Sequence, residues 1–461
     1  MSFDSVIFLS CFLPALLIAY WLIPGLKAKN WVLLIFSLIF YSFSGLSGLV
    51  LLMALALFNF LMGLWLRKNP GKALLAAGVA VNVAFLCFFK YLNFFMGQVL
   101  GLEEVTLTVA VPLGISFFTF KSISYLADTY RDKENAARSF PKLLLFISFF
   151  PQIVTGPITR YRDFAPQLES RSHSIEATAA GLRRFIVGLG KKLILSGTLG
   201  TVVDAVFALP AGTLNAPLAW LGAIGYCLQL YFDFSGYIDM AIGLGRIFGF
   251  DTVENFNCPY LAPSIGIFWR RWHMSLSAWF RDYVYIPLGG NRKGAFRAGI
   301  NKCIVFLLCG IWHGANFTYL LWGIWHGVFS LLESTGLIPA KKLEKSRVLG
   351  HVYTLLVVCI GFVMFRAATV SQGFAFIGAM FTGFSVTAAS VAAWHTIVTA
   401  EAVVMLILGV IFCLPIPAGL LSRRVSPLRE HLANLGCVLL LALSIVYLAA
   451  GGFAPSIYAG F

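Results

Sequence analysis

Charged residues are scarce in this chain of 461 residues, and acidic residues are scarcer than basic ones. Asp, Glu, Lys and Arg together make up 11% of the sequence, against roughly 25% in ordinary soluble domains. Hydrophobic residues make up 59%. A soluble fold could not bury this much apolar surface without exposing large patches to water. The scarcity of charge therefore excludes a soluble protein and predicts an integral membrane protein.

The sequence also lacks the spacings of common cofactor and metal sites. Its nine cysteines are scattered through apolar stretches, with no CxxC pair and no Cys/His spacing typical of zinc. No GxSxG elbow, GxGxxG loop or Walker motif is present. We therefore expect no disulfide framework, no metal site and no bound cofactor.

The formal net charge of +15 would suggest a nucleic-acid partner in a soluble protein. Here the basic residues lie in short clusters between apolar runs, which is the positive-inside pattern of cytoplasmic loops. We expect these clusters to face anionic membrane lipid, with no nucleic acid as a partner. They are Lys27 and Lys29, Arg67–Lys72, Arg131–Lys142, Arg270–Lys302, Lys341–Arg347 and Arg423–Arg429.

The apolar runs have the length of membrane spans, since about 20 residues cross a bilayer as a helix. The first run lacks a basic segment before it and a cleavage site after it, so we interpret it as a retained span. The sequence predicts a single all-helical polytopic membrane domain over 1–461, with about 11 spans. The candidates are 5–24, 31–45, 47–66, 73–98, 107–127, 182–209, 217–245, 303–333, 351–366, 391–416 and 433–451.

Three apolar stretches do not fit a simple crossing. Basic residues bound 142–156 on both sides, which favours a re-entrant segment, and 372–384 is too short and is not counted as a span. The stretch 303–333 also lies between basic groups, so we expect two short helices with a break near Gly314–Tyr319. Non-helical backbone at that depth is tolerated only beside protein or a water-filled cavity.

Histidines inside apolar segments are the first candidates for chemistry, because ionisable groups are costly there. His273, His313 and His326 remain after histidines in loops or at span ends are set aside. Gly310–Gly314 (GIWHG) is repeated at Gly323–Gly327, and each copy is a GxxxG pattern that lets helices approach closely. The structural interpretation is that the glycines pack helices while each histidine donates a hydrogen bond to a neighbouring helix.

The functional interpretation is that a buried neutral imidazole acts as a general base for a hydroxyl. On one continuous helix, His313 and His326 would point about 140° apart, because each residue turns by about 100°. They can share a narrow site only if the helix breaks. Any group that orients an imidazole must come from elsewhere in the chain or from the backbone.

Two further polar segments remain open to structural and functional interpretations. Residues 268–283 mix aromatic and basic residues, which is typical of an interfacial amphipathic helix; alternatively, they line the entrance for a phosphate-bearing donor. The arginines concerned are Arg270, Arg271 and Arg281. Residues 229–239 place Asp233 and Asp239 in an apolar segment, where we expect partners such as Arg246 or Arg270.

Several runs resemble the membrane-bound O-acyltransferase superfamily. WRRWHMSLSAWFRDYVYIPLGGNR (269–292) and GIWHGANFTYLLWGIWHG (310–327) resemble its core. VPLGISFFTFKSISYLADTYR (111–131), FPQIVTGPITRYRDFAPQL (150–168) and YFDFSGYIDMAIGLGRIFGF (231–250) resemble its bacterial branch of alginate O-acetylation proteins. The core motifs therefore occupy 111–330.

The resemblance implies tilted helices and re-entrant segments around a central funnel that joins the two sides of the membrane. It places the essential histidine of the family on His313, a second on His273, and a supporting one on His326. We expect further supporting or funnel-lining positions at Trp312, Asp233, Asp239, Asp282 and Tyr319, and donor contacts from Arg270, Arg271 and Arg281.

The implied activity is transfer of an acetyl group from a cytoplasmic thioester, acetyl-CoA, across the bacterial inner membrane. The acceptor would be an extracytoplasmic polysaccharide of the alginate, peptidoglycan or cellulose type, reached through a periplasmic SGNH-type partner. The alternatives are a D-alanyl-type acyltransferase, a transporter or flippase with a histidine proton relay, and a scaffold for polymer secretion. Transporters usually carry related halves, whereas the repeat found here is five residues long.

Overall fold

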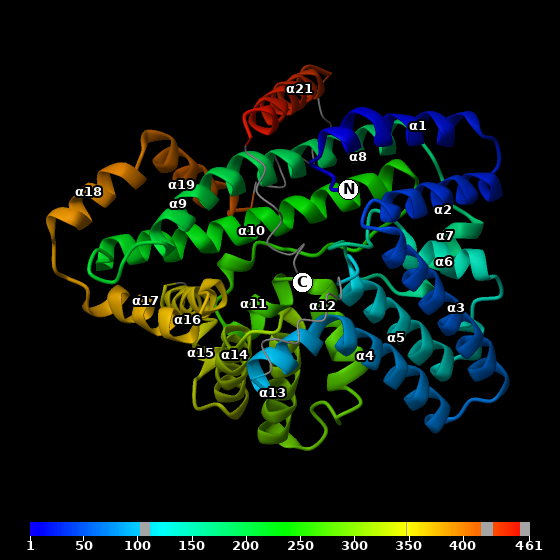
Figure 1. Cartoon of the computed structure of the whole chain (residues 1–461), viewed down its shortest axis with the longest axis horizontal. Coiled ribbons are helices and arrows are strands. Elements are labelled where there is room, and N and C mark those ends of the chain that lie inside the picture. Colours follow the sequence, from blue (N-terminus) through cyan, green and yellow to red (C-terminus); the bar gives the residue numbers. More distant parts are fainter. Residues whose placement is uncertain (102–110, 347, 416–426, 452–461) are drawn as a thin grey trace. The chain divides into compact units, whose positions relative to one another are not determined.

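The computed structural model describes residues 1–101, 111–346, 348–415 and 427–451, and within them the chain is helical with no strand (Figure 1). The predicted all-helical membrane fold is thereby confirmed. The start of the predicted span 107–127, Arg347, and most of the basic cluster Arg423–Arg429 lie outside the described residues. The chain forms two compact units, Met1–Phe185 with Tyr237–Glu254, and Ile186–Gly236 with the residues from Asn255 onward. The single domain over 1–461 stays a prediction.

The first unit is built around buried phenylalanines. Phe3, Phe8, Phe40 and Phe150 are fully buried, with ring centroids 5.1 to 6.3 Å apart. Tight aromatic packing of this kind stabilises the junction of several helices. Its helices are η1 (Phe8–Phe12), α1 (Leu13–Leu22), α2 (Leu26–Ser42), α3 (Leu46–Lys68), α4 (Lys72–Phe94), η2 (Phe95–Val99), α5 (Ile115–Arg131), η3 (Lys133–Asn135), α6 (Phe140–Ser148), α7 (Tyr161–Glu169) and the start of α8 (Ile175–Gly190).

The second unit holds the histidines singled out above. Within it α14 contacts α11, α13 and α16, so four helices surround one region. Its helices are η4 (Lys191–Ser196), α9 (Gly197–Phe207), the first part of α10 (Ala216–Ile247), η5 (Pro259–Leu261), α11 (Ile265–Arg271), α12 (Met274–Phe280), η6 (Arg281–Tyr285), α13 (Gly294–His313), α14 (Phe317–Thr335), α15 (Ala340–Leu343), α16 (Leu349–Arg366), α17 (Val370–Thr382), α18 (Ala388–Ile397), α19 (Ala400–Phe412) and α21 (Pro427–Ala449).

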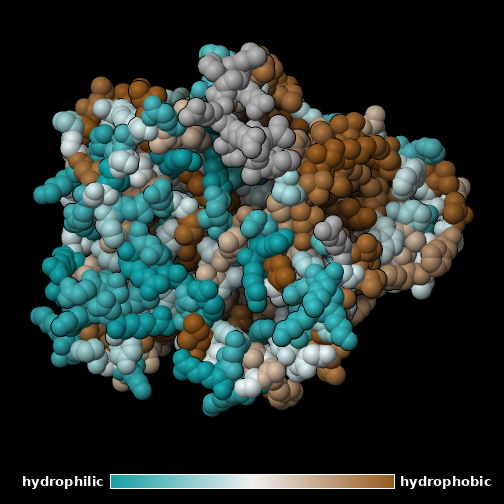
Figure 2. All heavy atoms as spheres, turned by 180° about the vertical axis from the view of Figure 1, so that it is seen from behind, coloured by the Kyte–Doolittle hydropathy of each residue, from teal (hydrophilic) through white to brown (hydrophobic). Residues whose placement is uncertain are grey.

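Six helices in the described chain are long and apolar enough to cross a membrane, or seven if one bent pair forms a single span. The multi-pass character predicted from the sequence is confirmed, whereas the count of about 11 is not. Figure 2 shows wide areas of hydrophobic surface on the face it presents, as expected for a chain in contact with lipid. The six are Leu46–Lys68, Lys72–Gly97, Ile175–Phe207, Gly294–His313, Leu349–Arg366 and Glu430–Ala449.

The candidate span 391–416 is not one straight helix, and its crossing as a single span stays a prediction. The chain there forms α18 and α19, which meet at an angle of 70°. Thr399 begins the second helix, because its side chain accepts the N–H of Ala402 and so satisfies one of the free donors at a helix start. The stretch 372–384 corresponds to α17, whose 13 residues agree with the prediction that it is no full span.

The stretch 142–156 forms no spanning helix, as predicted. Helix α6 has nine residues, and buried non-helical backbone follows it. Side chains from neighbouring helices partner this segment: the Ser37 hydroxyl accepts the N–H of Phe150 at 3.2 Å, and the ammonium group of Lys121 donates to Gln152 Oε1 at 3.0 Å. Irregular backbone in an apolar protein needs such partners. Entry and exit on the cytoplasmic side stay predictions.

Candidate active site

The break that the sequence predicted within 303–333 is confirmed. Helix α13 ends at His313, Gly314 is extended, and Asn316 begins α14 by accepting the N–H of Thr318 at 3.1 Å. Asparagine is among the preferred residues at this helix-start position. Both helices are longer than expected, since α13 begins at Gly294. The break folds α14 back along α13.

Glycines make that close approach feasible. A Cβ atom on Gly310 would lie 2.5 Å from the carbonyl oxygen of Tyr319, and one on Gly323 would lie 2.5 Å from that of Phe306. The Cα atoms of the two glycines also face each other across the contact. The packing role predicted for the repeated GxxxG pattern is therefore correct. The same residues carry the two histidines into one neighbourhood.

The three histidines lie along a connected series of aromatic rings. His273 lies 6.4 Å from Trp312, Trp312 lies 4.8 Å from His313, and His313 lies 5.1 Å from Trp322, all between ring centroids. Trp322 in turn lies 5.2 Å from His326. The break in the helix thus lets His313 and His326 share Trp322, which a continuous helix would not allow.

His313 lies at the centre of this series. Its side chain is buried, with a relative exposure of 3%. Phe365 of α16 packs edge-on against its ring at 5.1 Å, and Tyr319 lies 6.5 Å away. Tyr319 in turn packs against Phe365 at 4.7 Å. Aromatic rings therefore hold the imidazole at the end of α13 in a low-dielectric setting.

His326 is fully buried, yet neither of its ring nitrogens has a hydrogen-bond partner in the described part of the chain. The predicted hydrogen bond from this histidine to a neighbouring helix is therefore wrong. Gly361 of α16 gives the ring its room, since a Cβ there would lie 2.6 Å from Nε2. Trp269 packs edge-on against the ring at 4.9 Å. The indole nitrogens of Trp269 and Trp322 are likewise buried without a described partner.

His273 sits in an unusual backbone conformation between α11 and α12. Its φ is +45°, in the left-handed region that side chains other than glycine and asparagine seldom adopt. Such strain persists only when the surroundings hold it, and it is common at functional sites. Phe234 packs edge-on against the imidazole at 4.7 Å, and the side chain is 2% exposed.

Asn255 holds the His273 ring and determines its tautomer. The Asn255 Oδ1 atom accepts the backbone N–H of Ser275 at 2.9 Å and lies 3.2 Å from Nδ1 of His273. Because a backbone N–H only donates, this atom is an acceptor, and Nδ1 of His273 donates to it. The lone pair then lies on Nε2, which is buried without a described partner. Burial lowers the pKa of His273 to about 3, so the ring is neutral at physiological pH.

Glu333 is a carboxylate that sequence reasoning missed. Its two oxygens accept the N–H groups of Ile265 and Gly266 at 2.8 and 2.9 Å, and Tyr353 donates to it at 3.2 Å. The carboxylate thereby neutralises the positive end of α11 and ties that helix to α14. It positions the segment that leads to His273.

The two aspartates of α10 have basic partners other than those predicted. Asp233 accepts a hydrogen bond from Lys192 at 2.6 Å, and both side chains are at most 5% exposed. Asp239 pairs with Arg184, 2.9 Å away, which also binds Glu254. The expected partners Arg246 and Arg270 are wrong, because neighbouring helices supply closer cations. The sequence alone could not identify these two partners, because they lie far along the chain. Lys192 is 41 residues from Asp233, and Arg184 is 55 residues from Asp239.

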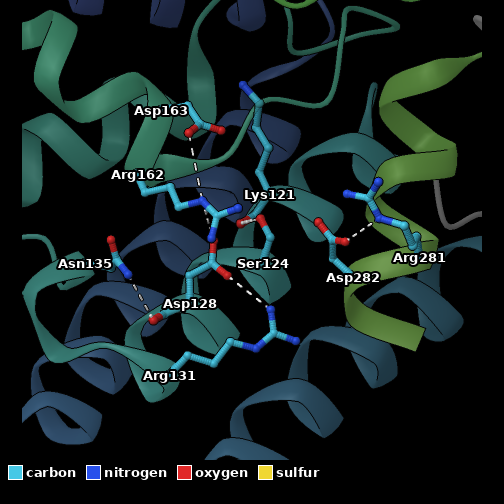
Figure 3. A network of polar contacts seen from close by, with 9 residues as sticks. All are labelled: Lys121, Ser124, Asp128, Arg131, Asn135, Arg162, Asp163, Arg281 and Asp282. Carbon is cyan, nitrogen blue, oxygen red and sulfur yellow. Dashed lines mark hydrogen bonds and ion pairs between the residues drawn. The ribbon is translucent and has the colours of Figure 1, made fainter. Parts of the chain in front are cut away.

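The arginines of 268–283 have separate surroundings. Arg270 is exposed, and Arg271 donates to the Leu261 carbonyl at 3.2 Å. Arg281 is exposed and pairs with Asp282 at 2.7 Å (Figure 3). Asp282 thus joins a surface ion pair in the described contacts, and a joint donor site formed by the three arginines stays a prediction.

Asp128 in the first unit is a second buried acid that the sequence did not single out. Its carboxylate lies 3.6 Å from Arg131 and 3.9 Å from Arg162 (Figure 3). Asn135 donates to its carbonyl at 3.3 Å. These contacts join α5 to α7 and the η3 turn. The spacing Asp128–Arg131 was visible as an i,i+3 pair, whereas Arg162 is brought in by the fold.

The second unit therefore places three buried imidazoles among tryptophans. Within the described residues, Nε2 of His273 and both ring nitrogens of His326 have no hydrogen-bond partner. This arrangement suits proton transfer with an uncharged hydroxyl in a site shielded from solvent. In the described residues, no group of three or more His, Cys, Asp or Glu side chains is arranged to hold a metal ion.

Comparison with known proteins gives concordant matches. The family model of the membrane-bound O-acyltransferases matches residues 36–371. A probable alginate O-acetylase of Pseudomonas putida is 42% identical over 394 residues, which cover 83% of this chain and 80% of that protein. A peptidoglycan O-acetyltransferase of Helicobacter pylori is 36% identical and covers 69% of this chain and 67% of its own length. A teichoic acid D-alanyltransferase of Bacillus subtilis is 37% identical over 44% of this chain and 53% of its own length.

Proposed function

Because the chain belongs to the membrane-bound O-acyltransferase family, we propose that it passes an acetyl group from a cytoplasmic thioester to an extracytoplasmic polysaccharide. The chain is an O-acyltransferase and a multi-pass membrane protein. The polysaccharide class follows from similarity to alginate and peptidoglycan O-acetylating proteins. The membrane would be the bacterial inner membrane, and an SGNH-type periplasmic protein would complete transfer to the sugar.

The observation that carries the proposal is the convergence of His273, His313 and His326 around Trp312 and Trp322. A scaffold has no need of the buried ring nitrogens that the described residues leave without partners on His273 and His326, because each such polar group costs stability. A general base, in contrast, needs a neutral ring with a lone pair that substrate can reach.

In the proposed reaction, His313 takes the proton of the acceptor hydroxyl as its oxygen attacks the thioester carbonyl. The C–S bond then breaks, and the imidazolium of His313 gives the proton to the departing thiolate, which leaves as the thiol. His273 offers a second lone pair at Nε2, suited to accept a hydrogen bond from the acceptor or to carry the proton onward. His326 supports the rings that enclose His313, through Trp322. Acetyl-CoA is the proposed donor, and no covalent acetyl-enzyme is required.

A D-alanyl donor is the second candidate, because a teichoic acid D-alanyltransferase matches part of this chain. The two donors share thioester chemistry and differ in the acyl group. Supplying each donor separately to the same preparation distinguishes them.

The test is acetyl transfer by the purified protein in nanodiscs, with radiolabelled acetyl-CoA, a candidate periplasmic partner and the polysaccharide. We expect wild type to label the partner or the polysaccharide and His313→Ala to lower the rate at least about 100-fold, the usual range for losing a general base. His395→Ala is the matched control, since His395 is exposed on α18.

Each outcome has a distinct meaning. Full activity in a folded His313→Ala protein would remove His313 from the chemistry and direct the test to His273 and His326. If wild type shows no transfer with acetyl-CoA but transfers the acyl group of a D-alanyl thioester, the donor is the D-alanyl thioester. Movement of the intact donor across the membrane, with no acyl transfer, would support the alternative function as a transporter or flippase. A stable acetyl adduct on the chain during turnover would replace direct transfer by a covalent intermediate.

A further inference from the structure

Three basic side chains lie together in the first unit. The C-terminal end of α1 and the first turn of α2 meet there with the connection from α7 to α8 (Figure 1). The three side chains are Lys29, Arg171 and His173, and we call them the basic cluster. All three contact Tyr20: the Lys29 ammonium lies 4.9 Å from its ring, and Arg171 and His173 lie 3.1 and 2.6 Å from its hydroxyl. A shared tyrosine therefore brings two permanent positive charges and an imidazole together.

No carboxylate pairs with the basic cluster in the described part of the chain. Arg171 donates to neutral acceptors, which are Asn30 Oδ1 at 2.6 Å and the carbonyl oxygens of Gln167 and Phe248, both at 3.0 Å. Among the described residues, the Lys29 ammonium contacts the rings of Tyr20 and Trp21 and makes no hydrogen bond. Arg184, in contrast, binds two carboxylates.

The positive charge of Lys29 and Arg171 affects the pKa of His173, the third member of the basic cluster. Burial, followed by the charges of Lys29 and Arg171, lowers the pKa of His173. A positive potential that disfavours a further proton would equally favour an anion.

The surroundings of the basic cluster are typical of a membrane boundary. Helix α1 is apolar and ends at Leu22, and Lys29 lies in the first turn of α2. Trp21, which is 43% exposed, contacts Lys29 and His173, and Trp31, which is 54% exposed, follows Lys29 by two residues in α2. Exposed tryptophans at the end of an apolar helix are typical of the lipid headgroup level. The anions abundant at that level are phosphates of phospholipids.

We propose that the basic cluster is a binding site for the phosphate group of an anionic phospholipid, held by Lys29 and Arg171 and bordered by Trp21. Lysine supplies a point charge and arginine a planar donor group, both suited to phosphate oxygens. The bound lipid would fix the junction of α1, α2 and the α7–α8 connection. The basic cluster belongs to the first unit, and lipid binding there would not depend on the acyl donor.

The test is native mass spectrometry of the full chain in detergent, titrated with phosphatidylglycerol and, separately, with phosphatidylcholine. Lys29→Gln is the main variant, because it removes the charge and two ring contacts but no hydrogen bond. Lys27→Gln is the matched control, since Lys27 is an exposed lysine two residues away. Arg171→Lys keeps the charge and loses the planar donor group, which limits damage to the fold.

We expect wild type and Lys27→Gln to retain phosphatidylglycerol in preference to phosphatidylcholine. Lys29→Gln should weaken that retention about five-fold, as expected for the loss of one basic contact near the headgroups. Equal retention by Lys29→Gln and Lys27→Gln, with both proteins folded by size-exclusion chromatography, would overturn the proposal. Displacement of the lipid by millimolar inorganic phosphate, with no headgroup preference, would show an adventitious phosphate site and equally overturn it.

Discussion

Asn255 fixes the tautomer of His273, because its Oδ1 atom is shared between the Ser275 N–H at 2.9 Å and Nδ1 of the imidazole at 3.2 Å. The two side chains belong to different segments, 18 residues apart. The arrangement leaves Nε2 as the basic atom, directed into a buried region where the described residues offer it no partner. A base prepared in this way needs no rearrangement before it accepts a proton.

The first prediction concerns this pair. Asn255→Leu removes the acceptor that orients His273, and we expect kcat for acetyl transfer to fall about 10-fold or more, part of the typical 10²–10⁴ contribution of a general base. Asn255→Asp should instead stabilise the imidazolium form and move the acidic limb of the pH–rate profile to higher pH. An unchanged rate and an unchanged profile in both folded variants would show that Asn255 has no bearing on the chemistry.

The second prediction is an acid sensitivity of the fold. The pKa of His273 is about 3 in the folded chain, against about 6.5 for the unfolded one. Above pH 6.5 both states are neutral; between pH 6.5 and 3 the unfolded chain binds the extra proton. Stability from this group should therefore fall as pH drops through that window, by about 1.4 kcal/mol per pH unit. Thermal unfolding of wild type and His273→Asn from pH 7.5 to 5 measures it.

Asparagine is chosen there because it tolerates the left-handed backbone at position 273. His273→Asn should flatten the dependence on pH, whereas the exposed His395→Asn should leave it as in wild type. Parallel curves for wild type and His273→Asn would contradict the assignment.

The third prediction tests the crossing of α13 and α14. Gly323→Ala places a methyl group 2.5 Å from the Phe306 carbonyl, a backbone atom that cannot rotate away. We expect a loss of about 1–3 kcal/mol in stability, as for overpacking elsewhere, together with reduced activity because His313 and His326 move apart. Gly378→Ala in α17 is the control, since its Cβ would meet no atom within 4 Å. Equal unfolding temperatures for the two variants would refute the close crossing.

The fourth prediction separates structure from chemistry at Asp233. Breaking the buried pair with Lys192→Met or Asp233→Leu alone should cost about 3–5 kcal/mol, because each removes one partner of a buried ion pair and keeps the other charge buried. The double variant should recover most of the stability. If it also recovers acetyl transfer, Asp233 is a packing residue. Recovered stability with lost activity would assign Asp233 to the reaction.

Much of the architecture was predictable because it depends on local physics. The lack of charge and the long apolar runs predict membrane helices whatever their neighbours, and the sequence Gly314-Ala315-Asn316 stops one helix and begins another by local backbone preferences. The count of spans is not confirmed, since hydropathy alone cannot distinguish a straight helix from a bent pair such as α18 and α19.

The partners of the polar residues were not predictable in this way. Asp233 and Asp239 required basic partners, yet their identity, Lys192 and Arg184, depended on which helices pack together. Glu333 and Asn255 carry no local motif and act through segments 68 and 18 residues away. The basic cluster likewise joins Lys29 to Arg171, which lie far apart in the chain and meet at Tyr20.

The sequence by itself determined that this chain is a helical membrane protein, that its polar residues gather in a few segments, and that His273, His313 and His326 are the imidazoles to examine. Only the tertiary structure decided that these three lie along one series of rings, because tryptophans and glycines from α11, α13, α14 and α16 set the spacing. The physical reason is that hydropathy and helix stops act over a few residues, whereas hydrogen-bond partners and ring contacts form between segments that only packing brings together.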